Sequence, residues 1–191
     1  MCIAIVAPAG KLVKETTLLE CNASNPDGAG FAYVKDGKVE ISKGFFKIGE
    51  FIAEYKKKAE AFGKDNPMLL HFRIATQGKV NADNTHPFPI KGGALIHNGS
   101  LWYKRGEQKK SDTREFAERM YNNLSYDVVR AALPEVTEAL EWNKLAMLYD
   151  DGNYLRIGKW YEDEGIWYSN ETYKPWGTEF TRRYAGPSCD I

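Results

Sequence analysis

The chain contains 191 residues, which is enough for one sizeable hydrophobic core and short for two, so we expect a single domain over residues 1–191. Lys and Arg total 26, as do Asp and Glu, so the chain lacks the excess positive charge that favours nucleic acid or an anionic membrane as a partner. Its apolar runs are shorter than a membrane span, and its N-terminus lacks the basic segment of a signal peptide. We therefore expect a cytoplasmic protein.

The first third of the chain contains patterns for three strands followed by one helix. Residues 2–7 are small and apolar and predict a buried strand that begins almost at the N-terminus. Residues 21–30 are rich in turn formers, and residues 31–42 predict two antiparallel strands joined at an Asp-Gly turn. Residues 48–62 carry apolar side chains at helical spacing, with Gly63 as the expected C-terminal cap.

The middle of the chain contains two strands whose ends carry polar residues. Residues 68–76 alternate between two faces, and this alternation places His71 and Arg73 on the same face. Residues 93–97 predict a second buried strand, followed by Asn98-Gly99, a pair that forms sharp turns.

The last third contains helices followed by strands. A helix is expected from Ser111 or Asp112, either of which can cap it, to about residue 122. A second helical stretch over residues 125–140 is disturbed at Pro134. The final strands, over residues 145–149, 154–157 and 166–169, are expected to form an antiparallel meander. The predicted order of elements along the chain is strands, one helix, strands, two helices and strands. This order favours a layered α+β domain over an alternating βαβ fold.

Cys2 is the most informative single residue. Removal of Met1 would place a thiol and a free α-amine on the same residue. The α-amine has a reference pKa of about 7.7 to 8.0, so it can act as the general base of the thiol. Taken alone, however, Cys2 also fits a small buried strand residue. Cys2, Cys21 and Cys189 are odd in number and widely spaced, which argues against disulfides and a zinc-thiolate site.

Several short motifs follow this N-terminal cysteine in a fixed order. They are His71 to Gly78, Asn84 to Phe88, His97-Asn98-Gly99 and Ser111-Asp112-Thr113. Together with Cys2 and the turn over residues 25–30, they resemble the glutaminase domain of class II glutamine amidotransferases, which are N-terminal nucleophile hydrolases. The resemblance spans nearly the whole chain. It implies a four-layer αββα sandwich, in which helices cover two antiparallel sheets.

The resemblance also implies a set of substrate contacts. Arg73 matches the family arginine that binds the α-carboxylate of glutamine, and Thr76 matches a residue that lines the same carboxylate pocket. Asp112 matches the family aspartate that binds the α-ammonium group. An ordinary ion pair for Arg73 and a helix cap for Asp112 are the structural alternatives.

The implied chemistry is amide hydrolysis through a covalent intermediate. The Asn98 side chain and the Gly99 N–H match the family's oxyanion hole, although Asn-Gly is also an ordinary turn. Attack by Cys2 on the glutamine side-chain amide would give a thioester and ammonia, and water would then hydrolyse the thioester to glutamate. No metal or organic cofactor is implied.

Three features depart from the family pattern. Ile3 stands where glycine usually follows the nucleophile, and Gln77 stands where many members have histidine. Both changes bear on glutamine binding or on the identity of the amide substrate, and we expect the branched Ile3 side chain to restrict the approach of substrate. A retained Met1 would hold the Cys2 nitrogen in a peptide bond and remove the general base.

Other functions fit the same residues. The chain stops after the glutaminase-like region, so either a separate enzyme accepts the ammonia, or the protein is a free-standing glutaminase or a hydrolase of a related amide. An inactive binding module of the same fold is a further alternative. His71, His86 and His97 together also fit a catalytic zinc site.

Overall fold

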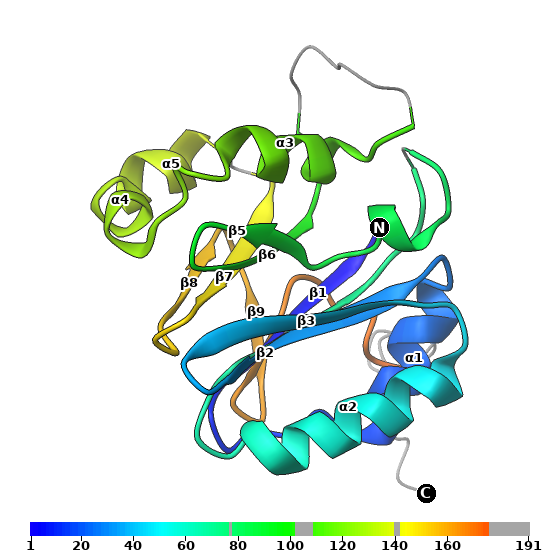
Figure 1. Cartoon of the computed structure of the whole chain (residues 1–191). Coiled ribbons are helices and arrows are strands. Elements are labelled where there is room, and N and C mark those ends of the chain that lie inside the picture. Colours follow the sequence, from blue (N-terminus) through cyan, green and yellow to red (C-terminus); the bar gives the residue numbers. More distant parts are fainter. Residues whose placement is uncertain (77, 102–108, 140–141, 176–191) are drawn as a thin grey trace, which may run out of the picture.

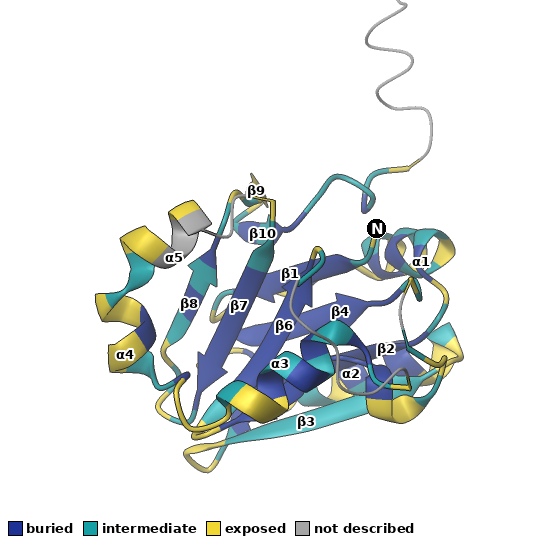
Figure 2. Cartoon of the chain, turned by 90° about the horizontal axis from the view of Figure 1, so that it is seen from above, coloured by how far each residue is buried: buried dark blue, intermediate teal, exposed yellow. Residues whose placement is uncertain are grey.

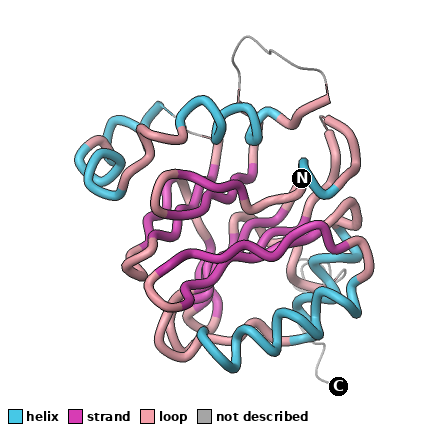
Figure 3. The backbone as a smooth tube through the Cα atoms, in the orientation of Figure 1, coloured by secondary structure: helices cyan, strands magenta, loops and turns pink. Residues whose placement is uncertain are grey.

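A computed structural model describes residues 1–76, 78–101, 109–139 and 142–175. Two antiparallel sheets form its centre, and helices cover both outer faces (Figure 1). Figure 3 shows the two strand layers enclosed between two helical layers. The α+β class and the predicted four-layer αββα sandwich are therefore confirmed. None of the described helices is long and apolar enough to cross a membrane.

The larger sheet has six strands, in the order β3-β2-β4-β1-β10-β9. Their bounds are Ile3–Ala7 for β1, Ala29–Lys35 for β2, Lys38–Phe45 for β3, Met68–Phe72 for β4, Tyr161–Asp163 for β9 and Ile166–Tyr168 for β10. β1 pairs with β4 on one side and with β10 on the other, so the N-terminal strand lies in the interior of the sheet. This position brings the start of the chain to the edge where β4 ends.

The smaller sheet has four strands, in the order β5-β6-β7-β8. Their bounds are Phe88–Ile90 for β5, Gly93–Asn98 for β6, Lys144–Tyr149 for β7 and Tyr154–Ile157 for β8. The predicted C-terminal meander is wrong in one respect. After β8 the chain crosses to the six-stranded sheet, where β10 pairs with β1. Local spacing identifies these strands but does not reveal which distant strand each one pairs with.

The five α-helices of the described residues divide between the two outer faces, and a short 3₁₀ helix, η1, lies beside β3. They are α1 (Glu15–Ser24), α2 (Ile48–Phe62), η1 (Ala82–Asn84), α3 (Asp112–Met120), α4 (Tyr126–Ala131) and α5 (Leu133–Ala139). Helices α1 and α2 cover the six-stranded sheet, and α3, α4 and α5 lie on the other side of the molecule (Figure 1). α2 has the predicted bounds and ends at Gly63, whose φ of −74° makes it a right-handed cap.

Local sequence patterns do not predict helix α1 (Glu15–Ser24). They assign residues 21–30 to a turn-rich stretch, and the last turn of α1 lies within that range. The segment combines Thr, Cys, Asn and Ser with a Lys14 N-cap that makes no side-chain capping bond. Tertiary packing stabilises it instead, since Leu18 and Cys21 are fully buried in the core beneath α1 and α2.

The helical stretch predicted over residues 125–140 forms two helices, α4 and α5, in the structure. Pro134 lies in the first turn of α5, where proline is tolerated.

Three apolar cores separate the four layers, and alternation along β1 assigns its residues to two of them. Ile3 and Ile5 pack into the core beneath α1 and α2, whereas Ala4 and Val6 face the other sheet. The third core lies between the four-stranded sheet and the helices α3 to α5. Figure 2 shows the central strands such as β1, β4, β6 and β7 buried, the edge strand β3 half-buried, and parts of the helices exposed. By the same alternation, Cys2 shares the inter-sheet face with Ala4.

The inter-sheet layer also holds two buried histidines. The rings of His71 and His86 stack with their centroids 3.8 Å apart, and His71 Nε2 donates to the backbone oxygen of His97 over 3.0 Å. Among the described residues, no hydrogen-bond partner reaches His71 Nδ1 or either ring nitrogen of His86. Burial lowers the pKa of His71 to about 3 and lowers the pKa of His86 well below its ordinary value. Both rings are therefore neutral in the folded protein near neutral pH.

This burial predicts acid sensitivity in a defined pH range. Below about pH 6.5, unfolded histidines bind protons that folded His71 and His86 do not bind, so stability falls as pH falls. We expect the free energy of unfolding to decrease by roughly 1.4 kcal/mol per histidine for each pH unit. Urea unfolding at pH 7, 6 and 5 measures this slope, and His86→Gln should remove the share of one histidine, while His71 and His97, whose pKa burial also lowers, keep theirs. Equal stability at pH 7 and pH 5 would contradict the prediction.

Candidate active site

Cys2 lies directly before β1, in contact with the segment that follows β4. Its Sγ is 3.4 Å from both the backbone nitrogen and the backbone oxygen of Ile74. Burial raises the pKa of the Cys2 thiol, while the Ile74 N–H and the positive charge of Arg73 act in the opposite direction. Because the net shift is upward, the thiol is mainly protonated at neutral pH. A nucleophile at this position therefore needs a general base.

The backbone of Cys2 is fixed by a residue from the far end of the chain. Asn170 Nδ2 donates to the Cys2 backbone oxygen over 2.7 Å, and β10 brings Asn170 to this position. Met1 precedes the site and is 77% exposed. Neither the Ile74 contacts nor the Asn170 contact uses an atom of Met1. Removal of Met1 would thus leave the described anchors of Cys2 in place and convert its nitrogen into an α-amine.

Arg73 lies immediately after β4 and is 3% exposed. Its Nη1 donates to the backbone oxygen of Lys79 over 3.1 Å. Burial lowers the pKa of Arg73, while the charges of Cys2, Asp27 and Asp112 raise it. Cys2, Asp27 and Asp112 therefore each lie close enough to Arg73 to affect its pKa. The structure thus brings two other sequence-predicted residues, Cys2 and Asp112, near Arg73.

Asp112 is the first residue of α3, and Ser111 is the N-cap, because Ser111 Oγ accepts from the Arg114 N–H over 3.2 Å. Asp112 Oδ1 accepts from the Thr113 N–H over 2.7 Å, and Oδ2 accepts from the Leu101 N–H over 2.9 Å. In general, each oxygen of an ionised carboxylate can accept two hydrogen bonds. These contacts orient the Asp112 carboxylate at the N-terminus of α3.

Asn98 ends β6 and is linked to β1 through a hydroxyl group. Asn98 Nδ2 donates to Ser169 Oγ over 2.9 Å, and the same oxygen accepts from the Ala4 N–H over 2.9 Å. The Ser169 N–H in turn donates to the Ala4 backbone oxygen. An amide nitrogen carries two hydrogens. Ser169 accepts one of them, and the second hydrogen is not used in this contact.

Gly99 follows with a φ of +145°, in the region that side chains rarely adopt. A Cβ atom at this position would lie 2.3 Å from Asn143 Oδ1. His97 Nε2 donates to that same Asn143 oxygen over 2.8 Å. The close approach of Asn143 therefore requires glycine, and it fixes the backbone that carries the Gly99 N–H.

The zinc alternative does not fit the histidine geometry. The ring nitrogens of His97 lie 2.8 Å from Thr113 Oγ1 and 2.8 Å from Asn143 Oδ1, whereas His71 and His86 stack on each other. Within the described ranges, no group of three His, Cys, Asp or Glu side chains is arranged to hold a metal ion. The three histidines instead support the packing around the site.

The remaining sequence predictions have different outcomes. Thr76 is exposed, and no hydrogen bond among the described residues joins its side chain to Cys2 or Arg73. Ile3 is fully buried in the core beneath α1 and α2, so the expectation that its side chain obstructs the substrate is wrong. Alternation along β1 directs that side chain away from the inter-sheet face. Gln77 and Cys189 lie outside the described residues.

Three residues that position the site, Asp27, Ser169 and Asn170, lie in segments that resemble the family, but sequence reasoning assigned them no role. Asp27 Oδ2 accepts from the Ala75 N–H over 2.8 Å and thereby holds the segment that follows Arg73. Ser169 orients Asn98, and Asn170 holds the Cys2 carbonyl. Asp27 lies in the turn over residues 25–30, and the other two follow β10. Their polarity was visible in the sequence, but their partners are 48 to 168 residues away.

Comparison with known proteins gives relatives that include two glutamine–fructose-6-phosphate aminotransferases. A glutamine–fructose-6-phosphate aminotransferase of Staphylococcus aureus is 37% identical over 78 residues, which is 39% of this chain and 12% of that enzyme. The namesake enzyme of Aquifex aeolicus is 30% identical over 128 residues, which is 58% of this chain and 20% of that enzyme. The chain thus matches about a fifth or less of the length of these relatives. No family model matches it.

Two solved structures also resemble the chain. A glutamine phosphoribosylpyrophosphate amidotransferase from B. subtilis aligns with 78% of this chain and 35% of its own, at 15% identity and a TM-score of 0.44. A glutamine aminotransferase class-II domain protein from Silicibacter pomeroyi aligns with 88% of this chain and 87% of its own, at 13% identity and a TM-score of 0.46. The sequence relatives confirm the family resemblance that the motifs predict.

Proposed function

We propose that this homologue of the class II glutamine amidotransferases hydrolyses the side-chain amide of glutamine to glutamate and ammonia, with Cys2 as the nucleophile. The observations that support the proposal are the approach of Cys2 and Asp112 to Arg73 and the link from Asn98 through Ser169 to Ala4, two residues after Cys2. A thiol, a cation, an anion and an amide donor are the groups that this reaction requires. The homology supports handling of the glutamine amide nitrogen.

In the proposed mechanism, removal of Met1 first exposes the Cys2 α-amine. The amine takes the thiol proton, because the raised pKa of Cys2 keeps the thiol protonated until a base acts. The thiolate then attacks the amide carbon, and the oxyanion accepts hydrogen bonds from Asn98 Nδ2 and the Gly99 N–H. The amine transfers its proton to the departing nitrogen, which leaves as ammonia. Water activated by the same amine hydrolyses the thioester.

Substrate recognition is proposed to use opposite charges at the two ends of the glutamine backbone. Arg73 binds the α-carboxylate and Asp112 the α-ammonium, while Thr76 lies on the segment after Arg73 and completes the carboxylate pocket. Residues 1–191 are proposed to act as one glutaminase domain, without a metal or organic cofactor. The ammonia is released or passes to a separate acceptor enzyme.

Product analysis tests the proposal directly. Processed protein, with loss of Met1 verified by intact mass, is incubated with L-glutamine, and glutamate and ammonia are measured. D-glutamine and asparagine serve as controls for recognition of the backbone and of side-chain length. Thiol-dependent release from L-glutamine is expected. Release only from a different amide would identify a related hydrolase, and binding of glutamine without turnover would identify an inactive binding module.

The Arg73→Lys variant tests the carboxylate contact. Lysine keeps the charge but loses the planar, bidentate geometry of the guanidinium group, so we expect KM for glutamine to rise about 10- to 100-fold with a smaller change in kcat. Steady-state kinetics measure the effect, and a thermal melt checks folding. Turnover of a primary amide without an α-carboxylate should change little. An equal loss for both substrates would instead indicate a structural role.

A further inference from the structure

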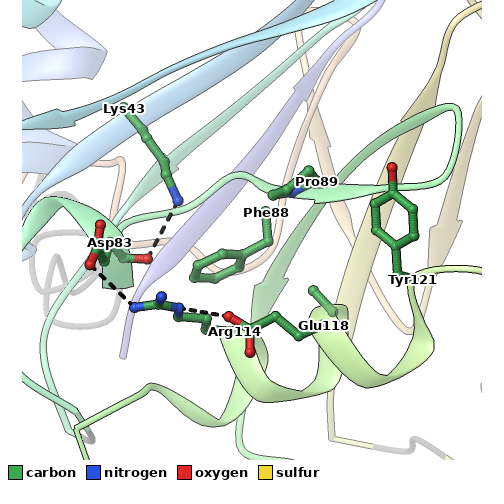
Figure 4. Close-up of a pocket in the computed structure, with 8 residues that line it drawn as sticks. Lys43, Asp83, Phe88, Pro89, Arg114, Glu118 and Tyr121 are labelled. Atoms are coloured by element: carbon green, nitrogen blue, oxygen red, sulfur yellow. Dashed lines mark hydrogen bonds and ion pairs between the residues drawn. The ribbon is translucent and has the colours of Figure 1, made fainter.

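A pocket of about 440 Å³ lies between β3, η1, β5 and α3, away from the residues assigned to glutamine. No step of the proposed mechanism uses it. Figure 4 shows Lys43 and Arg114 reaching into the same region from different elements, with the Phe88 ring between them. Ligand pockets in proteins commonly have volumes of about 300–1,000 Å³, with apolar walls and a few polar groups. This pocket has that size and composition.

Lys43 carries the least compensated charge in the pocket. Its Nζ lies 4.5 Å from the centroid of the Phe88 ring and donates over 3.4 Å to the Asp83 backbone oxygen, which is a long hydrogen bond. Among the described residues, it forms no ion pair with a carboxylate. Burial and the charge of Arg114 lower the pKa of Lys43 to about 8, against the weaker effects of Asp83 and Glu118. The ammonium group is thus partly desolvated without a strong partner.

Arg114 provides a second cation on the α3 side. Its Nε donates to Glu118 over 2.9 Å, and its Nη1 lies 3.5 Å from Asp83 Oδ2. A guanidinium group has five N–H donors, so these two contacts leave donors for a ligand. Glu118 also pairs with Lys110 over 2.9 Å. Two cations, Lys43 and Arg114, and two carboxylates, Asp83 and Glu118, thus line the pocket. Both carboxylates pair with Arg114, and Lys43 is the lining cation without a carboxylate ion pair among the described residues.

The remaining walls are apolar and closely built. Phe88 is buried, and Pro89 and Tyr121 extend the apolar surface beside it. Gly44, next to Lys43, has a φ of +85°, and a Cβ atom there would lie 2.7 Å from the Ala82 Cβ. β3 and η1 therefore approach each other more closely than a larger residue would allow. This close approach places Asp83 beside Lys43.

We propose that this pocket binds a small organic anion whose negative group contacts Lys43 and Arg114 and whose apolar body packs against Phe88, Pro89 and Tyr121. A carboxylate or a phosphate monoester provides the required charge. An apolar or aromatic body displaces water from the Phe88 side. The pocket shares α3 with Asp112 but none of the residues assigned to glutamine, so this proposal stands independently of the proposed function.

The direct test uses phenyl phosphate and benzoate as probes, with inorganic phosphate and phenol as the separated halves. Titration of isotope-labelled protein, followed by NMR, should show saturable shifts of the amides of Phe88, Ala117 and Tyr121 with the two complete probes. Weaker binding is expected for each half alone. The stronger of phenyl phosphate and benzoate identifies the preferred head group. No saturable shift at these residues would overturn the proposal.

Variants and pH test the role of Lys43. Lys43→Met keeps the length of the side chain, removes its charge and should weaken binding at least about tenfold, whereas Lys57→Met on the exposed face of α2 should have no effect. Affinity of the wild-type protein should fall as pH rises through about 8, where Lys43 loses its proton. Phenyl phosphate keeps its charge there, since its second pKa is about 6. Equal affinity at pH 7 and pH 9.5 would contradict the proposal even if the variant failed to fold.

Discussion

Replacing Cys2 by alanine is expected to reduce kcat for glutamine hydrolysis on the order of 10⁴- to 10⁶-fold, because no covalent intermediate can form. The measurement is glutamate release under saturating glutamine. The fold should survive, since the Asn170 contact uses the backbone of Cys2 and the core residues of β1 begin at Ile3. Thermal melting of both proteins checks this point.

Cys21→Ala is the matched control. Cys21 is a free thiol buried in α1, and burial raises its pKa far above the ordinary range, so it cannot supply a thiolate. Its loss should alter stability but not kcat. A Cys2→Ala protein that still releases glutamate at the wild-type rate, or a Cys21→Ala protein that is folded and inactive, would refute the assignment of the nucleophile.

The same residue allows a separate test of the general base. An N-terminal extension that keeps the Cys2 nitrogen in a peptide bond leaves the thiol intact but removes the α-amine. We expect such a protein to lose activity on the order of 10²- to 10⁴-fold, the usual contribution of general acid–base catalysis. Proteolytic removal of the extension, so that Cys2 becomes the first residue, should restore it. Full activity before cleavage would show that another group acts as the base.

The Asn98→Ala variant should lower kcat by about 10²- to 10³-fold with little change in KM, because an oxyanion donor acts mainly in the transition state. This loss corresponds to about 2.7 to 4 kcal/mol in the activation barrier. Asn98→Asp keeps the size of the side chain but replaces the donor with an acceptor. It should be at least as inactive, and pre-steady-state kinetics should show slow formation of the thioester in both variants.

The Ser169→Ala variant is the control that separates the positioning of Asn98 from its role as a hydrogen-bond donor. It removes the hydroxyl that accepts from Asn98 Nδ2 and from the Ala4 N–H, but leaves the Asn98 donor present. We expect a smaller loss of kcat than in Asn98→Ala, together with a loss of stability of about 1–3 kcal/mol from the unsatisfied Ala4 N–H. An Asn98→Ala protein that retains kcat would show that Asn98 only links the two sheets.

The regular elements were predictable where a local pattern is strong. Helix α2 was predicted with its observed bounds because its apolar spacing needs only the 3.6-residue period. The β2–β3 hairpin follows from its Asp-Gly turn, in which Asp36 and Gly37 both have positive φ. Helix α1 has no such pattern and exists because Leu18 and Cys21 are buried against other elements. Propensity alone therefore could not detect it.

Local sequence patterns identify the candidate groups of the site: a cysteine next to the N-terminus, an arginine after a strand, an Asn-Gly turn and an aspartate at a helix start. The surroundings of these groups depend on tertiary structure. Pairing of β1 with β4 and β10 brings Cys2 to Ile74 and Asn170, and Ser169 connects Asn98 to β1. The alternation of side chains along β1 directs Ile3 into the core beneath α1 and α2. Such contacts depend on which distant strands pair, and local sequence patterns do not encode that choice.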